Sequence, residues 1–147
     1  MKAYTLTELV IVVVIAGILA AVVIPMFNSA HDRIKIEAAY RQLMQDIRYV
    51  QQVAVARQVS HGISFDTVRE SYFAYRQDIS NIIKDPATYK PYTVTYASGK
   101  FSGIDLVSAV VVEFNSIGAP LSAGSVTISY KGVTKTVSVE ENTGRVY

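Results

Sequence analysis

The chain has 147 residues, of which 50% are hydrophobic and 18% are charged, and its formal net charge is +2. It contains no cysteine, which excludes structural disulfides, thiolate metal sites and a cysteine nucleophile. The near-neutral charge gives no strong electrostatic reason to expect nucleic acid or an anionic membrane surface as the main partner.

The chain begins with one apolar segment, residues 4–27, in which Glu8 is the single charged residue. Its uncharged part, residues 9–27, would form a helix of about 28 Å, just under the hydrocarbon thickness of a bilayer. A transmembrane helix over residues 4–30 is therefore the first interpretation. A carboxylate in or near the apolar layer costs about 2.5 to 3.5 kcal/mol on insertion scales, so Glu8 needs a partner.

A free amino group on Tyr4 would be such a partner, and it exists only if the chain is cut between Ala3 and Tyr4. The run MKAYTLTELVIVVVIAGILAAVVIP resembles the class III signal of type IV pilins and type II secretion pseudopilins. In that family prepilin peptidase removes a short basic leader, usually between Gly and Phe, and the new N-terminal residue is methylated. Counted from Tyr4, Glu8 is the fifth residue, Gly17 the fourteenth and Pro25 the twenty-second, where the family commonly has these residues.

The resemblance implies that residues 1–3 are a leader, that Tyr4 is N-methylated and that Glu8, Gly17 and Pro25 serve assembly. It implies a single-pass inner-membrane protein with its C-terminal domain outside, later extracted into a periplasmic pseudopilus or an extracellular pilus. In the filament, Glu8 of one subunit would meet the Tyr4 amine of the next. The implied partners are homologous pilin or pseudopilin subunits, prepilin peptidase, the inner-membrane assembly machinery and, before assembly, membrane lipid.

Three other interpretations of the apolar segment stay open. A secretory signal cut near Ala20 or Ala21 would have a basic start and small residues at the cut, but it gives Glu8 no role. A plain membrane anchor for an unrelated domain is the second. A fully buried core helix is the third, and the rest of the chain is too short to cover 19 apolar residues on all sides.

Residues 31–58 change from a continuous apolar run to a stripe with spacings of three and four, which predicts an amphipathic continuation of the same helix. Gly17 and Pro25 are predicted weak points, and the helix is expected to kink or loosen at the proline. The predicted buried stripe is Ile36, Tyr40, Leu43, Ile47, Val50 and Ala54, and the charges at other angles are Arg33, Lys35, Glu37, Arg41, Asp46 and Arg48.

Residues 59–147 predict an antiparallel β domain, so the expected fold is α+β and pilin-like, with the long N-terminal helix packed on the sheet. Residues 104–114, with the apolar run 107–112, are predicted as the most buried strand. Lys131 and Gly132 are predicted to form a two-residue hairpin turn. The other predicted strands are 63–65, 72–75, 93–96, 125–130 and 133–139, with a surface loop over 77–91 and a turn and edge strand over 142–147.

Two further stretches carry a more specific resemblance. Residues 54–66 (AVARQVSHGISFD) and 137–147 (VSVEENTGRVY) are similar to the GspH/FimT group of minor pseudopilins and minor pilins. That group commonly has an Ala/Arg-rich helix end before the first strand and a Gly-Arg pair near the C-terminus.

Nothing in the sequence supports an enzyme. His31 and His61 stand outside any metal-binding spacing, so no metal or cofactor is expected. His31 is expected at the membrane surface and His61 in a turn before Gly62. Glu140 and Glu141 flank a turn, where they are expected to be solvated.

An alternative function is that of a minor pilin with an adhesive or DNA-binding surface at the filament tip, because some minor pilins of this group take up DNA. DNA binding requires Lys and Arg clustered on one surface. The candidate DNA contacts are Lys131, Lys135 and Arg145, but Glu140 and Glu141 intervene. Nucleic acid is therefore the less favoured partner.

Overall fold

The structure is a computed structural model that describes residues 5–147. The predicted cleavage site at Ala3 and Tyr4 lies outside the described residues, as do the side chains of residues 22–29, which include Pro25. The chain divides into two units, Met1–Ile34 and Lys35–Tyr147, which are described separately.

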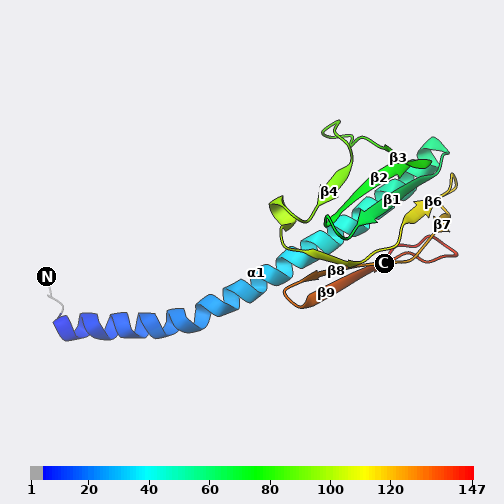
Figure 1. Ribbon diagram of the computed structural model, residues 1–147. Coiled ribbons are helices and arrows are strands. Elements are labelled where there is room, and N and C mark those ends of the chain that lie inside the picture. The colour runs from blue at the N-terminus through cyan, green and yellow to red at the C-terminus, as the bar shows by residue number, and fades with distance from the viewer. Residues whose placement is uncertain (1–4) are drawn as a thin grey trace. The chain divides into compact units, whose positions relative to one another are not determined.

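One long helix and nine short strands make up the described residues (Figure 1). The helix predicted over residues 4–58 is α1 (Leu6–Arg57). The strands are β1 (His61–Asp66), β2 (Ser71–Arg76), β3 (Asp78–Ile82), β4 (Thr93–Thr95), β5 (Asp105–Ser108), β6 (Val112–Phe114), β7 (Pro120–Ser122), β8 (Ser125–Tyr130) and β9 (Val133–Ser138), and a 3-10 helix, η1, covers Gly99–Phe101.

The first unit contributes the N-terminal part of α1, in which the side chains of residues 9–21 are uncharged and exposed. Helical backbone is assigned without a break through Gly17 and Pro25. In the part of the chain that the structure describes, no helix combines the length and the apolar character needed to cross a membrane.

In the second unit, the predicted stripe of α1 faces the sheets. Five of its six residues are buried and Tyr40 is half-buried, which confirms the prediction. Asp46 was expected among the exposed charges, and this was wrong: it is 7% exposed. It lies between the buried Leu43 and Val50 on the helix surface, where two tyrosines bond its carboxylate.

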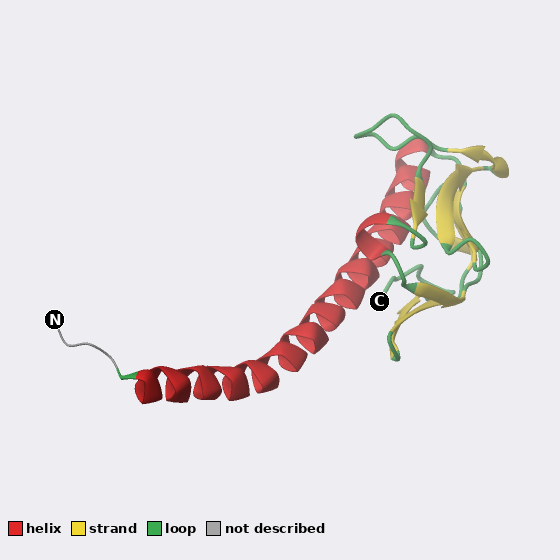
Figure 2. Ribbon diagram, turned by 60° about the vertical axis from the view of Figure 1, so that its left-hand side comes forward, coloured by secondary structure: helices red, strands yellow, loops and turns green. Residues whose placement is uncertain are grey.

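The strands form two antiparallel sheets, and both lie along one side of the C-terminal half of α1 (Figure 2). The larger sheet has the order β3-β2-β1-β6-β7, with β4 also paired to β2. The smaller sheet has the order β5-β8-β9. The core between the helix and the sheets contains the helix stripe together with Tyr72, Tyr96 and Phe114, which are fully buried.

The predicted loop over residues 77–91 contains a strand, so this part of the prediction was wrong. Strand β3 pairs with the end of β2, and all five of its residues are exposed. Because neither face of β3 is buried, its sequence shows none of the alternation that identifies a half-buried strand. The segment that follows returns through a bridge between Lys84 and Pro91, so residues 85–90 form an exposed loop.

The predicted strand over residues 104–114 is two strands in different sheets, and it is not the most buried one. The chain leaves the smaller sheet after β5 and enters the larger sheet at β6, so the apolar run lies on the crossing. A register shift between Leu106 and Ser108 leaves Val107 59% exposed, and Val110 is 48% exposed. The buried residues of the segment stand near its two ends, Ile104 and Leu106 at one end and Val112 and Phe114 at the other.

The hairpin predicted at Lys131 and Gly132 is confirmed. Strands β8 and β9 pair from Tyr130 and Val133 outward, and both turn residues have positive φ, 47° and 81°. This is the geometry that matches the right-handed twist of a two-residue hairpin. Near the C-terminus, Val139 bridges to Val146, so the predicted edge strand is a single bridge.

Candidate functional site

The N-terminal end of α1 is capped by Thr5. Its carbonyl accepts the N–H groups of Glu8 (3.1 Å) and Leu9 (3.2 Å), and its Oγ1 also accepts the Glu8 N–H (3.3 Å). Glu8 is the third residue of the helix, so Thr5-x-x-Glu8 has the spacing of a capping box. Thr5 was not among the predicted site residues, although this four-residue spacing is readable in the sequence.

The Glu8 carboxylate therefore stands at the positive end of the helix dipole, a position that stabilises an anion by about 0.3 to 1 kcal/mol when exposed. Glu8 is exposed, and within residues 5–147 no cation pairs with its carboxylate. Tyr4 is outside the described residues, so the pairing of Glu8 with a Tyr4 amine stays a prediction.

Ten large apolar residues surround the first turns of α1, each between 50% and 80% exposed. They cover every side of the helix, so the surface has no polar face to turn to water. An apolar surface of this size is unfavourable in water and must be covered by lipid or by other protein. These residues are Leu6, Leu9, Val10, Ile11, Val12, Val13, Val14, Ile15, Ile18 and Leu19.

Gly17 lies within this surface. A Cβ placed on it would meet no atom within 4 Å, so nothing in its own chain requires a glycine there. A glycine inside a helix costs about 1 kcal/mol relative to alanine. Its proposed role in assembly is compatible with the open space around it and stays a prediction, as does that of Pro25.

The candidate DNA contacts are partly engaged by their own chain. Lys135 on β9 pairs with Glu37 of α1 (Nζ to Oε2, 3.1 Å) and lies over the Tyr40 ring. Lys131 is in the β8–β9 turn, over the ring of Tyr130, and Arg145 lies in the C-terminal turn. Hydrogen bonds from Arg41 and Lys135 hold the pKa of Glu37 below its usual value. These local contacts offset part of the positive charge that DNA binding would need.

His61 is not in a turn, as the sequence suggested, but is the first residue of β1 and fully buried. Its Nδ1 lies 2.7 Å from the Val59 carbonyl oxygen, so the ring donates a proton there. Burial lowers the pKa of His61, and the charges of Arg57 and Arg76 lower it further. Both effects favour the neutral imidazole. In the described chain no three His, Cys, Asp or Glu side chains gather as a metal site would require.

The Asp46 carboxylate is a second polar group that was not among the predicted site residues. It accepts hydrogen bonds from the phenols of Tyr72 (2.6 Å) and Tyr92 (3.0 Å). Burial raises the pKa of Asp46, and the bonds from the two phenols oppose that rise. The contact ties α1 to β2 and to the segment before β4.

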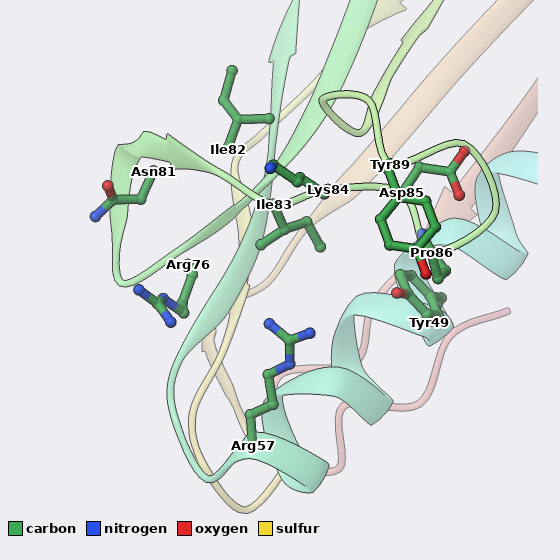
Figure 3. Close-up of a pocket in the computed structure, with 10 residues that line it drawn as sticks. All are labelled: Tyr49, Arg57, Arg76, Asn81, Ile82, Ile83, Lys84, Asp85, Pro86 and Tyr89. Atoms are coloured by element: carbon green, nitrogen blue, oxygen red, sulfur yellow. The ribbon is translucent and has the colours of Figure 1, made fainter.

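A cleft of about 580 Å³ lies in the second unit, among the last turns of α1, the β2–β3 connection and the loop after β3 (Figure 3). Arg57 extends from the end of α1 toward Ile83, while Arg76 comes from the end of β2. In the described chain neither guanidinium has a carboxylate partner. The cleft is lined by Tyr49, Arg57, Arg76, Asn81, Ile82, Ile83, Lys84, Asp85, Pro86 and Tyr89.

Comparison with known proteins gives one relative in sequence and two in structure. No family model matches the chain. It is 27% identical over 146 residues to the competence protein ComGD of Bacillus subtilis (strain 168), a match that covers 99% of this chain and 91% of that protein.

The fold is similar to that of the minor pseudopilin EpsH from the type 2 secretion system of Vibrio cholerae, with a TM-score of 0.58 and 14% identity over 76% of this chain and 93% of EpsH. It is also similar to the type IV minor pilin FimU of Pseudomonas aeruginosa (strain PAO1), with a TM-score of 0.56 and 15% identity over 79% of this chain and 89% of FimU. The predicted pilin-like α+β fold is thereby confirmed. None of the three relatives is named for an enzymatic activity.

Proposed function

We propose that this chain, a type IV pilin-like protein in sequence and fold, is a structural subunit of a type IV pilus or a type II secretion pseudopilus. The observation that carries the proposal is the first unit of α1. Its exposed apolar side chains surround the helix, and Glu8 stands at its start. A helix of this kind is suited to a bundle of like helices, in which neighbouring subunits bury the apolar surface that is unfavourable in water.

Processing would take place at the Ala3–Tyr4 bond. The leader would be residues 1–3, with Lys2 as its basic residue, and Tyr4 would become the methylated N-terminus. Two features support this site: a small residue is followed by an aromatic one, and α1 begins at Leu6, close behind the new terminus.

Before assembly, the helix would wait in the inner membrane with the second unit outside. The uncharged stretch of residues 9–27 supports this stage, because its length as a helix approaches the hydrocarbon thickness. The assembly machinery would then move the subunit from lipid into the filament, in the periplasm or outside the cell.

In the filament, Glu8 of one subunit would pair with the Tyr4 amine of its neighbour and set the axial register. A buried pair of this kind adds little net stability, but an unpaired charge in the same place costs several kcal/mol, so registers that leave Glu8 unpaired are disfavoured. A contact that repeats head to tail without closing produces a filament.

Mass spectrometry of the natural N-terminus tests the proposal. We expect a chain that begins at Tyr4 and carries one methyl group, recovered from a filament fraction together with other pilin-like subunits. A mature chain that retains Met1, or one that begins beyond Ala20, would contradict it.

A further inference from the structure

The cleft beside Arg57 and Arg76 has the composition of a recognition site for a carboxylate. Two guanidinium groups and the Lys84 ammonium line it, and the one acidic residue in its lining, Asp85, bonds its own loop through Ala87 and Thr88. Neither guanidinium has a carboxylate partner in the described residues, so no ion pair neutralises the positive charge there. Arginine binds a carboxylate with two parallel hydrogen bonds, which gives direction as well as attraction.

The remaining walls of the cleft favour a peptide over a phosphate chain. Tyr49, Ile83 and Tyr89 offer apolar area, and the Asp85 carboxylate would repel a second negative charge nearby. The cations gather in one compact cleft, whereas a nucleic-acid groove needs a row of cations that follows the backbone.

A matching acidic group stands on a tight turn near the C-terminus, over residues 140–145. The turn is closed by backbone bonds from Gly144 N–H to the Glu140 carbonyl and from Glu140 N–H to the Arg145 carbonyl. The Glu140 carboxylate accepts the Thr143 hydroxyl, but the exposed Glu141 carboxylate has no partner in the described residues. Glu141 is therefore an exposed, unpaired carboxylate on a hydrogen-bonded turn in the described chain.

The cleft and the acidic turn lie on opposite flanks of the same end of α1. On one flank, Tyr49 and Arg57 of α1 line the cleft. On the other flank, Gln51 holds the turn, because its Nε2 donates a hydrogen bond to the Gly144 carbonyl (3.1 Å). Thr143 of the turn lines a second hollow together with Gln51 and Val55. At about 100° per residue, the midpoint of Gln51 and Val55 lies roughly 180° around the helix from the midpoint of Tyr49 and Arg57.

We infer that the cleft receives the Glu141 turn of a second copy of this chain. This inference rests on the proposed filament function. Because the two surfaces are different and lie on opposite flanks, the contact is heterologous: each copy uses its cleft on one side and its turn on the other, so the contact can repeat along an assembly. It would join the second units of neighbouring subunits while the helices pack through α1.

Cross-linking of the full chain tests the contact, because the natural sequence contains no cysteine. Asn81 lines the cleft and Asn142 follows Glu141, so the double variant Asn81→Cys/Asn142→Cys places one thiol on each surface. In membranes of cells that assemble the filament, we expect a short bismaleimide to give a ladder of dimers, trimers and higher species. Each single-cysteine variant should give no ladder.

Charge variants in the same cysteine background identify the groups responsible. Arg57→Gln/Arg76→Gln should reduce the ladder at least about threefold, the scale of an exposed ion pair, and raised salt should reduce it further. The matched control Arg69→Gln/Lys100→Gln removes two exposed cations from another surface and should leave the ladder unchanged.

A charge exchange gives the sharpest result, because each copy supplies both halves of the contact. Arg76→Glu and Glu141→Arg should each weaken the ladder, and the double variant Arg76→Glu/Glu141→Arg should restore it. A double variant as weak as the two single variants combined would overturn the inference.

The remaining outcomes separate this contact from the filament function. Filaments of Asn81→Cys/Asn142→Cys that give no ladder would overturn the contact and leave the function standing, whereas the absence of filaments from the natural chain would remove both. A cross-link from the Asn81→Cys variant to a different pilin-like subunit would overturn the choice of a second copy. A DNA gel shift lost in Arg57→Gln/Arg76→Gln, without a ladder, would make the cleft a nucleic-acid site and overturn the inference.

Discussion

The phenol of Tyr72 donates a 2.6 Å hydrogen bond to the carboxylate of Asp46, deep in the contact between α1 and β2. Tyr92 donates a second bond to the same carboxylate, and the ring of Tyr92 stacks on Tyr49 of the helix. The Asp46 carboxylate therefore joins three separate parts of the second unit. Removing it leaves the phenol of the fully buried Tyr72 without this acceptor, and a buried unsatisfied donor costs about 1 to 3 kcal/mol.

Asp46→Asn should change how stability depends on pH. Burial raises the pKa of Asp46, so the folded protein holds this proton more tightly than the unfolded chain does. The resulting stabilisation is complete below the ordinary aspartate pKa of about 4 and is lost as pH rises through the raised folded pKa. The unfolding free energy of the natural chain relative to Asp46→Asn should therefore fall over that window, as thermal or denaturant unfolding can measure.

Asp85→Asn provides the control with the opposite sign. Hydrogen bonds from the Ala87 N–H and the Thr88 hydroxyl lower the pKa of Asp85, so its stabilisation is present above the ordinary pKa and is lost as pH falls. A hydrogen bond with Gln42 lowers the pKa of Asp46, and the charge of Asp85 raises it. Because the two carboxyl groups influence each other, both variants should be measured in the same buffers. Equal pH profiles for the two variants would contradict the assignment.

Two substitutions in one apolar run should differ sharply in cost. Val112→Thr places a hydroxyl in a fully buried site and should destabilise the protein by about 1 to 3 kcal/mol. Val107→Thr, in the same run, is at an exposed register shift and should change the unfolding free energy by no more than about 0.5 kcal/mol. Denaturant unfolding measures both, and equal losses would contradict the observed crossing between sheets.

The sequence predicted the features that depend on local periodicity. The stripe from Ile36 to Ala54 follows from the helical period, and the turn at Lys131 and Gly132 follows from the conformations that a two-residue hairpin requires. Both are decided within a few residues, so tertiary contacts did not alter them.

The wrong predictions concern features whose burial or sheet position depends on tertiary contacts. The run 107–112 is apolar except for Ser108, and nothing local shows that the chain changes sheets there. In the sequence, Asp46 does not differ from an exposed charge on a helix. The two residues that bond its carboxylate, Tyr72 and Tyr92, are distant in the sequence. The cleft around Arg57 and Arg76 could not be predicted for the same reason, because segments far apart in the sequence form its walls.

Gly62→Ala should destabilise the larger sheet. A Cβ at Gly62 would lie 2.5 Å from the hydroxyl end of the Tyr75 ring, its partner across β1 and β2. Tyr75 is buried and its hydroxyl bonds Glu113, so the ring cannot move aside freely. We expect a loss of about 1 to 3 kcal/mol in unfolding free energy, as for other overpacked cores. In the variant Gly62→Ala/Tyr75→Phe the hydroxyl is gone, and part of the loss should be recovered if the clash is its cause.

Substitutions at Thr5 and Glu8 should separate helix capping from filament assembly. Glu8→Val removes both the charge and the capping-box side chain, and should leave membrane insertion intact while impairing assembly. Glu8→Gln retains a residue that suits a capping box but loses the charge, so it should impair assembly as well. Thr5→Ala removes the hydroxyl that accepts the Glu8 N–H, costs about 1 kcal/mol of helix stability and should leave assembly largely intact.

Electron microscopy of sheared fractions, with immunoblots of the membrane fraction, measures assembly and insertion side by side. If Glu8 acts on a neighbouring subunit through its charge, Glu8→Val and Glu8→Gln fail together and Thr5→Ala does not. If Glu8 acts only by starting α1, Thr5→Ala and Glu8→Val should fail alike while Glu8→Gln assembles, because only the last keeps both capping-box residues, the Thr5 hydroxyl and a Glu or Gln at the third helical position. The second pattern would assign Glu8 to its own helix and remove it from the contact between subunits.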